Sequence, residues 1–280
     1  MILNVCKEAN MTSRDVVNII SKHLHTKKVG HTGTLDPLAT GVLIVCTHHD
    51  TKLVDIITAS SKEYIATMRL GIKTDTGDIT GNVLETSEYQ VTGEQVRAVL
   101  KSFLGESIQT VPFYSAIKIN GKKLYEYARN NETITLPTRK INIFAIELLY
   151  FENDTIKFKV TVSKGTYIRS LIEDIARKLG TLGTMTSLVR TKQGSFSLEN
   201  ANSLEDILND KYQEIPLLNV LTYPIYTLND TEYFKVKNGA KLSINKDDKI
   251  LTMVYNNKPI ALYMQDNGIY RVYKMLEVNN

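Results

Sequence analysis

A glycine-rich loop that runs directly into an apolar strand is the feature that most constrains the fold of this chain. It lies between Gly30 and Val45, GHTGTLDPLATGVLIV, which holds three glycines, an Asp-Pro pair and a terminal apolar run. Glycine permits backbone conformations that other residues avoid, and proline fixes the backbone beside Asp36. The run from Val42 to Val45 predicts a buried strand. An Asp-Pro pair alone is a common turn, whereas this combination indicates a carboxylate held rigidly at the rim of a cavity.

The same loop lacks the features of two common nucleotide sites. No Gly-Lys-Ser/Thr follows it, as in a Walker phosphate loop, and it has no Gly-x-Gly-x-x-Gly dinucleotide fingerprint. The five histidines and the two cysteines, Cys6 and Cys46, show no metal-ligand spacing. We therefore expect a protein of 280 residues that folds as one large and one small domain without metal or disulfide.

The location predicted from composition is the cytoplasm. No segment approaches membrane-spanning length, and the first residues, MILNVCKEANMTSRD, lack the apolar run of a signal peptide. Two distant cysteines are typical of a chain that works in a reducing compartment.

Two basic segments flank the loop and favour a nucleic-acid partner. The net charge of +4 is by itself a weak signal. The segment from Lys22 to His31 carries no acid, and the segment from Lys118 to Lys140 interleaves Lys122 and Lys123 with tyrosines. Either cluster alone is most simply a solvated surface. Together, beside one candidate active-site loop, they favour RNA or DNA, whose phosphates need distributed cations and whose bases need stacking surfaces.

The pattern along the chain predicts an α+β protein. A helix is expected from Thr12 or Ser13 to about His25, and Asn120-Gly121 predicts a hairpin. Period-2 and period-3.6 patterns predict strands at 42–46, 64–70, 141–149 and 156–162, and helices at 93–103 and 167–179. A linker near Tyr223-Pro224 leads to a tail with regularly spaced turn signals, which predicts a small all-β module. We therefore expect domains at 1–220 and 221–280.

Two further residues are candidates for the same site as Asp36. A carboxylate in a partly dry site needs a counter-charge to stay ionised. Arg169 opens the predicted helix in SKGTYIRSLIEDIARKLG, and Tyr64 lies in KEYIATMRLG. A surface arginine and a core tyrosine are the simpler interpretations of these two residues, and the residues alone leave both open.

At its full length GHTGTLDPLATGVL resembles the signature of the TruB family of tRNA pseudouridine synthases. The remaining motifs follow in the family's order through about residue 200, namely KEYIATMRLGIKTDTGDITG, QTVPFYSAIKINGKKLYEYAR, SKGTYIRSLIEDIARKLG and SLVRTKQGSF. In the tail, VKNGAKL and IALYMQDNGIYRVYKML resemble a short PUA domain. The resemblance implies a pseudouridine-synthase mixed sheet with flanking helices, followed by a small PUA-like RNA-binding domain.

The resemblance also implies an activity and residues for it. The expected reaction is the cofactor-free isomerisation of the uridine at position 55 in the T arm of tRNA. Asp36 would attack the sugar or abstract a proton, and Arg169 would keep it ionised. Tyr64 would stack on the target base and take part in proton transfer, while Leu188 would wall the pocket. His31 would contact the RNA where the uridine is extruded.

Three lysines complete the expected binding surface, with departures from the family pattern nearby. Lys122 and Lys123 would grip stem phosphates, and Lys7 matches the family's first motif. Glu8 stands where the family has proline, and the glycine of that turn is missing from the segment Cys6 to Ser13. The expected protein is a monomer that binds tRNA, with no metal and no protein partner.

Two other functions compete with the isomerase. One is a non-catalytic tRNA-binding or folding protein on the same scaffold. The other is a hydrolase with a carboxylate nucleophile, which would release free uracil. The isomerase is preferred because Asp36, Tyr64 and Arg169 occur together in their motifs.

Overall fold

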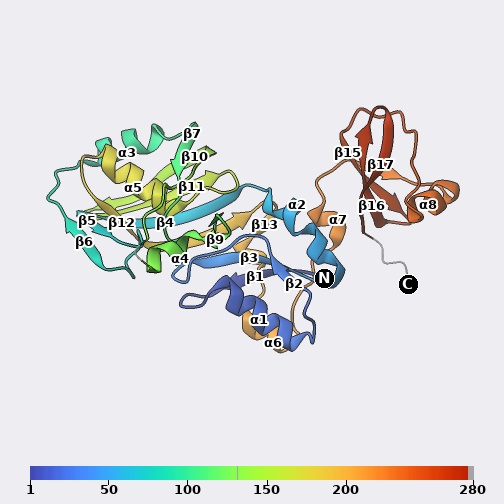
Figure 1. Cartoon of the computed structure of the whole chain (residues 1–280), viewed down its shortest axis with the longest axis horizontal. Coiled ribbons are helices and arrows are strands. Elements are labelled where there is room, and N and C mark those ends of the chain that lie inside the picture. Colours follow the sequence, from blue (N-terminus) through green and yellow to red (C-terminus); the bar gives the residue numbers. More distant parts are fainter. Residues whose placement is uncertain (131, 277–280) are drawn as a thin grey trace.

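The computed structural model describes residues 1–130 and 132–276, and shows an elongated molecule with a large mixed unit and a small module at one end (Figure 1). The predicted α+β class is confirmed, because one large mixed sheet is flanked by helices and a separate small sheet follows it.

A central sheet runs through the large unit. Its nine strands within the described residues are β1 (Ile2–Lys7), β2 (Val29–His31), β3 (Thr40–Thr47), β4 (Lys62–Leu70), β7 (Gly105–Thr110), β10 (Thr138–Glu152), β11 (Thr155–Val162), β12 (Gly183–Gln193) and β13 (Phe196–Ser197). Their order is β1-β3-β12-β4-β11-β10-β7, with β2 beside β3 and β13 beside β12. The β3–β12 pair is parallel and the other pairs are antiparallel.

Helices cover parts of this sheet and supply its core. They are α1 (Ser13–His23), η1 (His48–Leu53), α2 (Val54–Thr58), α3 (Gly93–Lys101), α5 (Ile168–Lys178), η2 (Leu198–Asn200), α6 (Leu204–Leu208) and α7 (Leu217–Val220). Helices α3 and α5 share one hydrophobic cluster with β4, β11 and β12. Strand β3 is buried on both faces, since Leu43 packs with α1 and α6 while Ile44 packs with η1 and α2. Its uninterrupted apolar run reflects this double burial.

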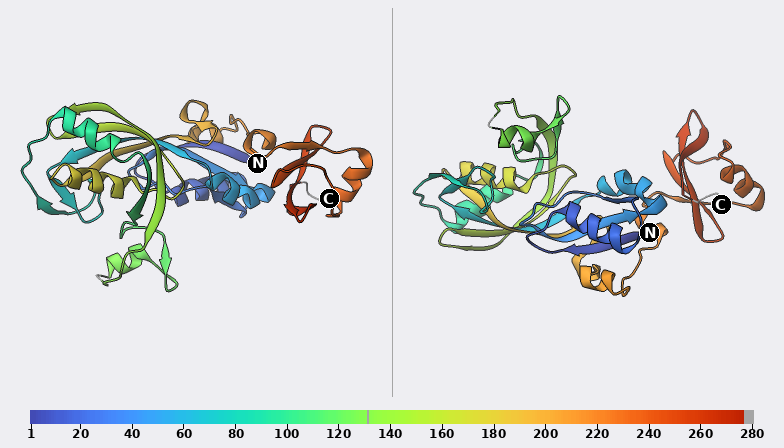
Figure 2. Two further views of the ribbon diagram at one scale, coloured as in Figure 1. Left: turned by 90° about the horizontal axis from the view of Figure 1, so that it is seen from above. Right: turned by 60° about the horizontal axis from the view of Figure 1, so that its bottom comes forward.

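Two smaller features project from the sheet. A hairpin follows β4, formed by β5 (Ile72–Thr74) and β6 (Val83–Thr86). The segment between β7 and β10 carries β8 (Lys118–Ile119), β9 (Lys122–Lys123) and α4 (Leu124–Arg129), and Figure 2 shows it standing away from the sheet. Asn120 and Gly121 both have positive φ, 53° and 81°, as a two-residue hairpin turn requires, so the predicted hairpin is confirmed.

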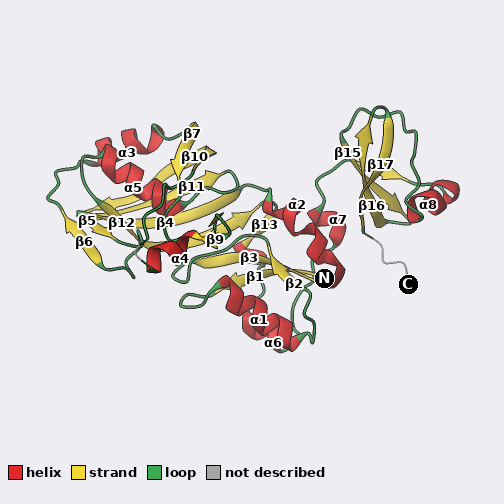
Figure 3. Ribbon diagram, in the orientation of Figure 1, coloured by secondary structure: helices red, strands yellow, loops and turns green. Residues whose placement is uncertain are grey.

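The C-terminal module contains a helix as well as strands, which corrects the all-β prediction for the tail. Its sheet has the order β14-β15-β16-β17, with bounds Ile225–Thr227, Ile250–Tyr255, Lys258–Asp266 and Ile269–Met275. Helix α8 (Asp230–Lys237) lies beside these strands (Figure 3). Two of the turn signals in the tail are the ends of this helix, because the Asn229 side chain caps its first turn and Gly239 follows its last. The signals at Asn256-Asn257 and Asn267-Gly268 are turns, as expected.

The expected boundary at residue 220 remains a prediction. Val220 and Leu221 lie in one hydrophobic cluster with Ile2 and Ile44 of the large unit and Leu262 of the module. The two parts are therefore joined by a shared apolar contact. No helix in the described part of the chain is long and apolar enough to span a membrane.

Candidate active site

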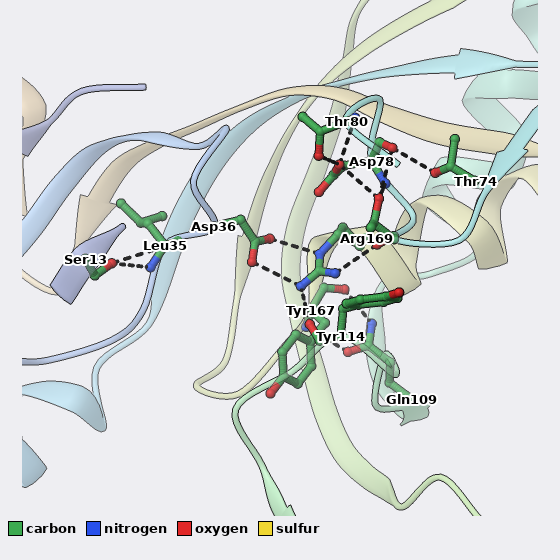
Figure 4. A network of polar contacts seen from close by, with 11 residues as sticks. Ser13, Leu35, Asp36, Thr74, Asp78, Thr80, Gln109, Tyr114, Tyr167 and Arg169 are labelled. Atoms are coloured by element: carbon green, nitrogen blue, oxygen red, sulfur yellow. Dashed lines mark hydrogen bonds and ion pairs between the residues drawn. The ribbon is translucent and has the colours of Figure 1, made fainter. Parts of the chain in front are cut away.

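The loop that carries Asp36 is held from both sides by neighbouring segments. The Ser13 hydroxyl, at the start of α1, accepts a hydrogen bond from the Leu35 N–H at 2.8 Å and donates to the Leu35 carbonyl at 3.2 Å (Figure 4). After the loop, Gly41 has φ +100°, and a Cβ there would lie 2.3 Å from the Arg190 carbonyl oxygen. Only glycine allows β3 and β12 to approach so closely, and this contact fixes where the loop ends.

A second clamp comes from the turn that departs from the family pattern. The buried Lys7 ammonium donates to the carbonyls of Glu8 and Met11, each at 2.7 Å, and of Pro37 at 3.3 Å. The Asn10 N–H also donates to the Pro37 carbonyl at 2.9 Å. Asn10 has φ 63° and so adopts the left-handed conformation that a glycine would supply. The altered turn thus still supports the residue next to Asp36.

The placement of Lys7 corrects the expectation that it binds RNA. Its side chain is fully buried, and it does not line the cavity described below. Burial lowers the pKa of Lys7 to about 8, against the opposing effect of the Asp36 charge. The geometry therefore makes Lys7 a positioning residue for the loop.

Asp36 and Arg169 form a bidentate ion pair. Nε of Arg169 donates to Oδ2 of Asp36 at 2.9 Å, and Nη2 donates to Oδ1 at 3.0 Å. The other guanidinium donors reach the carbonyls of Thr76 and Tyr114, both at 2.9 Å. The Arg169 side chain is 6% exposed and that of Asp36 is 28% exposed. The carboxylate is thus fixed in orientation, as a charge-assisted fork requires, while one side of it stays accessible.

The carbonyl of Thr76 is itself positioned by a polar turn. Oδ1 of Asp78 accepts from the Thr76 hydroxyl at 3.0 Å and from the N–H of Thr80 at 3.0 Å. The Met185 N–H donates to the Gly77 carbonyl at 3.1 Å, which ties the turn to β12. Figure 4 shows this turn beside Arg169, so a buried acid that does not touch Asp36 orders one of the arginine's acceptors.

The start of helix α5 is fixed by a side-chain amide. The Gln109 amide donates to the Tyr167 carbonyl at 3.0 Å and accepts from the Tyr167 N–H at 2.8 Å. The Ser170 hydroxyl donates to the Thr110 carbonyl at 2.9 Å. Strand β7 thereby sets the direction in which Arg169 leaves the helix, as Figure 4 shows for Gln109 and Tyr167.

A cavity of about 420 Å³ opens at the Asp36–Arg169 pair. Four predicted site residues, Asp36, Tyr64, Arg169 and Leu188, all line it. Tyr64 and Leu188 come from adjacent strands, β4 and β12, and each is 6% exposed. The volume falls in the range typical of small-ligand pockets. The cavity thus places the Asp36–Arg169 pair next to an aromatic and an apolar side chain.

The other predicted contacts lie outside this lining. His31 is partly buried, and its Nδ1 accepts from the Gly33 N–H at 3.3 Å. Burial, followed by the charges of Arg190 and Arg14, lowers the pKa of His31, so its neutral form is favoured near pH 7. His31 ends β2, directly before the loop that carries Asp36. Its contact with RNA remains a prediction.

Lys122 and Lys123 lie on the projecting segment. Lys122 pairs with Glu132 and sits 4.5 Å from the centre of the Tyr127 ring, while Lys123 donates to the Tyr125 hydroxyl at 3.0 Å. Tyr125 itself lines the cavity. The projecting segment therefore carries the two lysines and also contributes one residue to the cavity wall.

Several lining residues were not predicted. Tyr114 and Tyr167 add aromatic surface, and Lys62 and Arg190 add positive charge. The sequence signal for the two cations is the two-residue period of a strand, which puts residues i and i+2 on the same face. Lys62 is two residues from Tyr64, and Arg190 is two residues from Leu188. Among the described residues no group of three or more His, Cys, Asp or Glu side chains is arranged to hold a metal ion.

Comparison with known proteins shows the family to which this chain belongs. The model of the TruB family pseudouridylate synthase N-terminal domain matches residues 21–168, and that of the tRNA pseudouridylate synthase B C-terminal domain matches residues 169–224. The tRNA pseudouridine synthase B of Clostridium tetani is 46% identical over 273 residues, which cover 96% of this chain and 93% of the relative. The chain belongs to the TruB family. The protein of the same name from Bacillus pumilus is 41% identical, over 94% of this chain and 92% of the relative.

Solved structures support the TruB fold. An H/ACA ribonucleoprotein bound to a substrate RNA containing 2'-deoxyuridine includes a chain that matches with a TM-score of 0.74 and 26% identity, over 99% of this chain and 85% of that one. A chain of a Cbf5-Nop10-Gar1 complex matches with a TM-score of 0.75 and 27% identity, over 98% and 84%. The predicted pseudouridine-synthase sheet with a small C-terminal module is thereby confirmed for this TruB family member.

Proposed function

We propose that this chain isomerises a uridine of tRNA to pseudouridine, and that its target is position 55 in the T arm. The curated relatives that cover nearly the whole chain are called tRNA pseudouridine synthase B. The observation that carries the proposal for the site is the Asp36 carboxylate, fixed by Arg169 and open to a cavity beside Tyr64.

The cavity residues suit the chemistry of this isomerisation. The reaction breaks the bond from uracil N1 to the ribose and forms one from uracil C5 to the same carbon. The C5 proton leaves, N1 gains a proton, and no oxidant, reductant or cofactor is consumed. Asp36 starts cleavage either as a nucleophile or as a base, and Arg169 keeps it ionised in the partly dry site. The cavity wall retains the detached base until it has rotated and rejoined the sugar.

Access to the cavity requires the target uridine to leave its stack. A base inside folded RNA cannot reach a carboxylate beneath a surface, so the enzyme binds it extruded and offsets an unstacking cost of a few kcal/mol. Tyr64 supplies the stacking face within the cavity, and Leu188 closes the wall beside it. We propose that His31, next to Gly33 on the loop, contacts the RNA that the uridine leaves.

The test uses an unmodified tRNA transcript tritiated at uracil C5, incubated without added metal or cofactor. We expect tritium release and a pseudouridine that maps to position 55 alone. Tight binding with no release would contradict the isomerase and favour the RNA-folding hypothesis. Free uracil among the products would instead favour the hydrolase. We propose further that the enzyme acts in the cytoplasm as a monomer, without a protein partner.

Neutralising the projecting segment is expected to weaken tRNA binding. For Lys122→Gln combined with Lys123→Gln we expect affinity to fall roughly tenfold at low salt, and the slope of log affinity against log salt to become shallower by about one to two. The pairing of Lys122 with Glu132 keeps the change below the full value for two free cations. The measurement is a salt titration of the dissociation constant.

A matched control for this experiment exists on other surfaces of the protein. Lys157→Gln combined with Lys211→Gln removes the same charge from two exposed positions. If both double variants show the slope of the wild type, the projecting segment does not bind phosphates.

A further inference from the structure

Two buried cations share the cavity with Asp36, and neither has an acidic partner among residues 1–130 and 132–276. Lys62 is 6% exposed and Arg190 is 1% exposed, and both line the cavity. Within the described residues, the acceptors that their charged groups reach are all backbone carbonyls. Lys62 donates to Thr58 and Ser60, both at 2.9 Å, and Arg190 donates to Val42 at 2.6 Å and Gly33 at 3.0 Å.

These contacts leave donors over. An ammonium has three N–H donors and a guanidinium has five. Lys62 uses two of its three, and Nη1 of Arg190 has no protein acceptor among the described residues. Burying a charge costs desolvation free energy unless the charge is paired. An anion bound between these donors would offset part of that free energy.

The two cations both lie next to Gly33. A Cβ built on Gly33 would lie 3.5 Å from Nη1 of Arg190 and 3.6 Å from Cε of Lys62. Both cations therefore flank one glycine that also lines the cavity. Gly33 lies on the loop that leads to Asp36, so the two cations and the carboxylate belong to one cavity.

From this arrangement we infer that Lys62 and Arg190 form an anion subsite that binds a phosphodiester flanking the target uridine. The inference rests on the proposed function, since the phosphodiester is the anionic group of RNA. Arginine presents a planar fork to phosphate and lysine acts as a point charge. With the phosphate held here and the uracil against Tyr64, the ribose lies between the two anchors and is presented to Asp36.

The charges around Lys62 favour the binding of an anion next to it. Burial, then the charges of Arg190 and Lys164, lower the pKa of Lys62 to about 8. The ammonium thus remains mostly protonated at pH 7, at a cost that a phosphate would reduce.

A double-mutant cycle between protein and RNA tests the subsite. Three transcripts each carry one neutral methylphosphonate, on the 5' side of the target uridine, on its 3' side, or in a distant stem. Dissociation constants and single-turnover rates are measured for wild type and for Lys62→Gln. We expect one flanking substitution to weaken binding to the wild type by about tenfold, as for one charge-assisted hydrogen bond, and to have less than about a twofold effect on Lys62→Gln.

The controls separate this subsite from general charge and from folding. Lys157→Gln removes an exposed charge on β11 and is expected to keep the full tenfold effect, whereas Lys62→Arg is expected to restore most of it. Because Lys62 also bonds the carbonyls of Thr58 and Ser60, thermal melts are compared, and Lys62→Met serves as the second neutral variant if Lys62→Gln is destabilised.

Penalties that simply multiply at both flanking positions would overturn the inference. The proposed function is judged separately, by product formation from the unmodified transcript with wild-type protein. A wild type that makes no pseudouridine would refute the function, whereas product formation with multiplying penalties would refute only the anion subsite.

Discussion

Asp36→Asn is expected to lower the rate of pseudouridine formation by at least about a thousandfold, as is typical when a nucleophile or essential base is removed. Asparagine has nearly the same shape and can still accept one hydrogen bond from Arg169. The hydrogen bonds that hold the loop at Leu35 and Pro37 involve backbone atoms and do not depend on the carboxylate. It has no carboxylate to attack the sugar or take a proton. The dissociation constant for tRNA is expected to stay within about threefold of wild type, because phosphate contacts dominate affinity.

The measurement pairs single-turnover product formation with a binding titration. Asp55→Asn, an exposed acid of α2, provides a matched control that should leave both unchanged. Because Arg169 loses its counter-charge in Asp36→Asn, a melting curve checks that the variant is still folded. Normal turnover by folded Asp36→Asn would sink the aspartate mechanism. A variant that makes no product yet restores the cellular task would support the RNA-folding hypothesis.

The part of the site predicted from the sequence is the part that carries local signals. Asp36 stands in a loop whose glycines and proline can be read from the sequence, and Arg169 is the second residue of an amphipathic helix with a regular apolar face. The pairing of the two spans 133 residues. The need of a partly dry carboxylate for a counter-charge made Arg169 a candidate partner, and the resemblance to a family favoured it over a surface arginine. Once the structure places α5 against β4 and β12, the bidentate geometry follows from the position of the arginine near the start of the helix.

The features that were missed depend on tertiary context. Lysine is rarely buried, so the two-residue spacing from Tyr64 was only a weak signal for Lys62. No local pattern indicated that Lys7 and Lys62 would donate to backbone carbonyls inside the protein. Strand β12 was overlooked because Gly183–Gln193 mixes polar and apolar residues, yet it is an interior strand of the sheet, between β3 and β4. Helix α8 was overlooked because asparagine and glycine signal helix ends and turns alike.

Replacing Arg169 is expected to give the largest loss of stability among single changes in the site. In Arg169→Met the carboxylate of Asp36 loses its partner, and the carbonyls of Thr76 and Tyr114 lose their donors. Breaking a fully buried ion pair from one side costs about 3–5 kcal/mol. Because the Asp36 side chain is 28% exposed, we expect the lower end of this range, which corresponds to a fall in melting temperature of roughly 10 °C for a domain of this size. Product formation is expected to fall by at least about a hundredfold even in the folded fraction.

A second arginine of the same helix, Arg177, provides the control for this prediction. Arg177 is exposed and pairs with Asp174 within the last turns of α5, so Arg177→Met should cost less than about 1 kcal/mol. Arg169→Lys separates charge from geometry, because a lysine keeps the positive charge but cannot reach Asp36, Thr76 and Tyr114 together. We expect it to recover part of the stability and little of the rate. If Arg169→Lys turned over like wild type, net charge alone would suffice near Asp36, and the fork that joins loop, turn and projecting segment would have no role in catalysis.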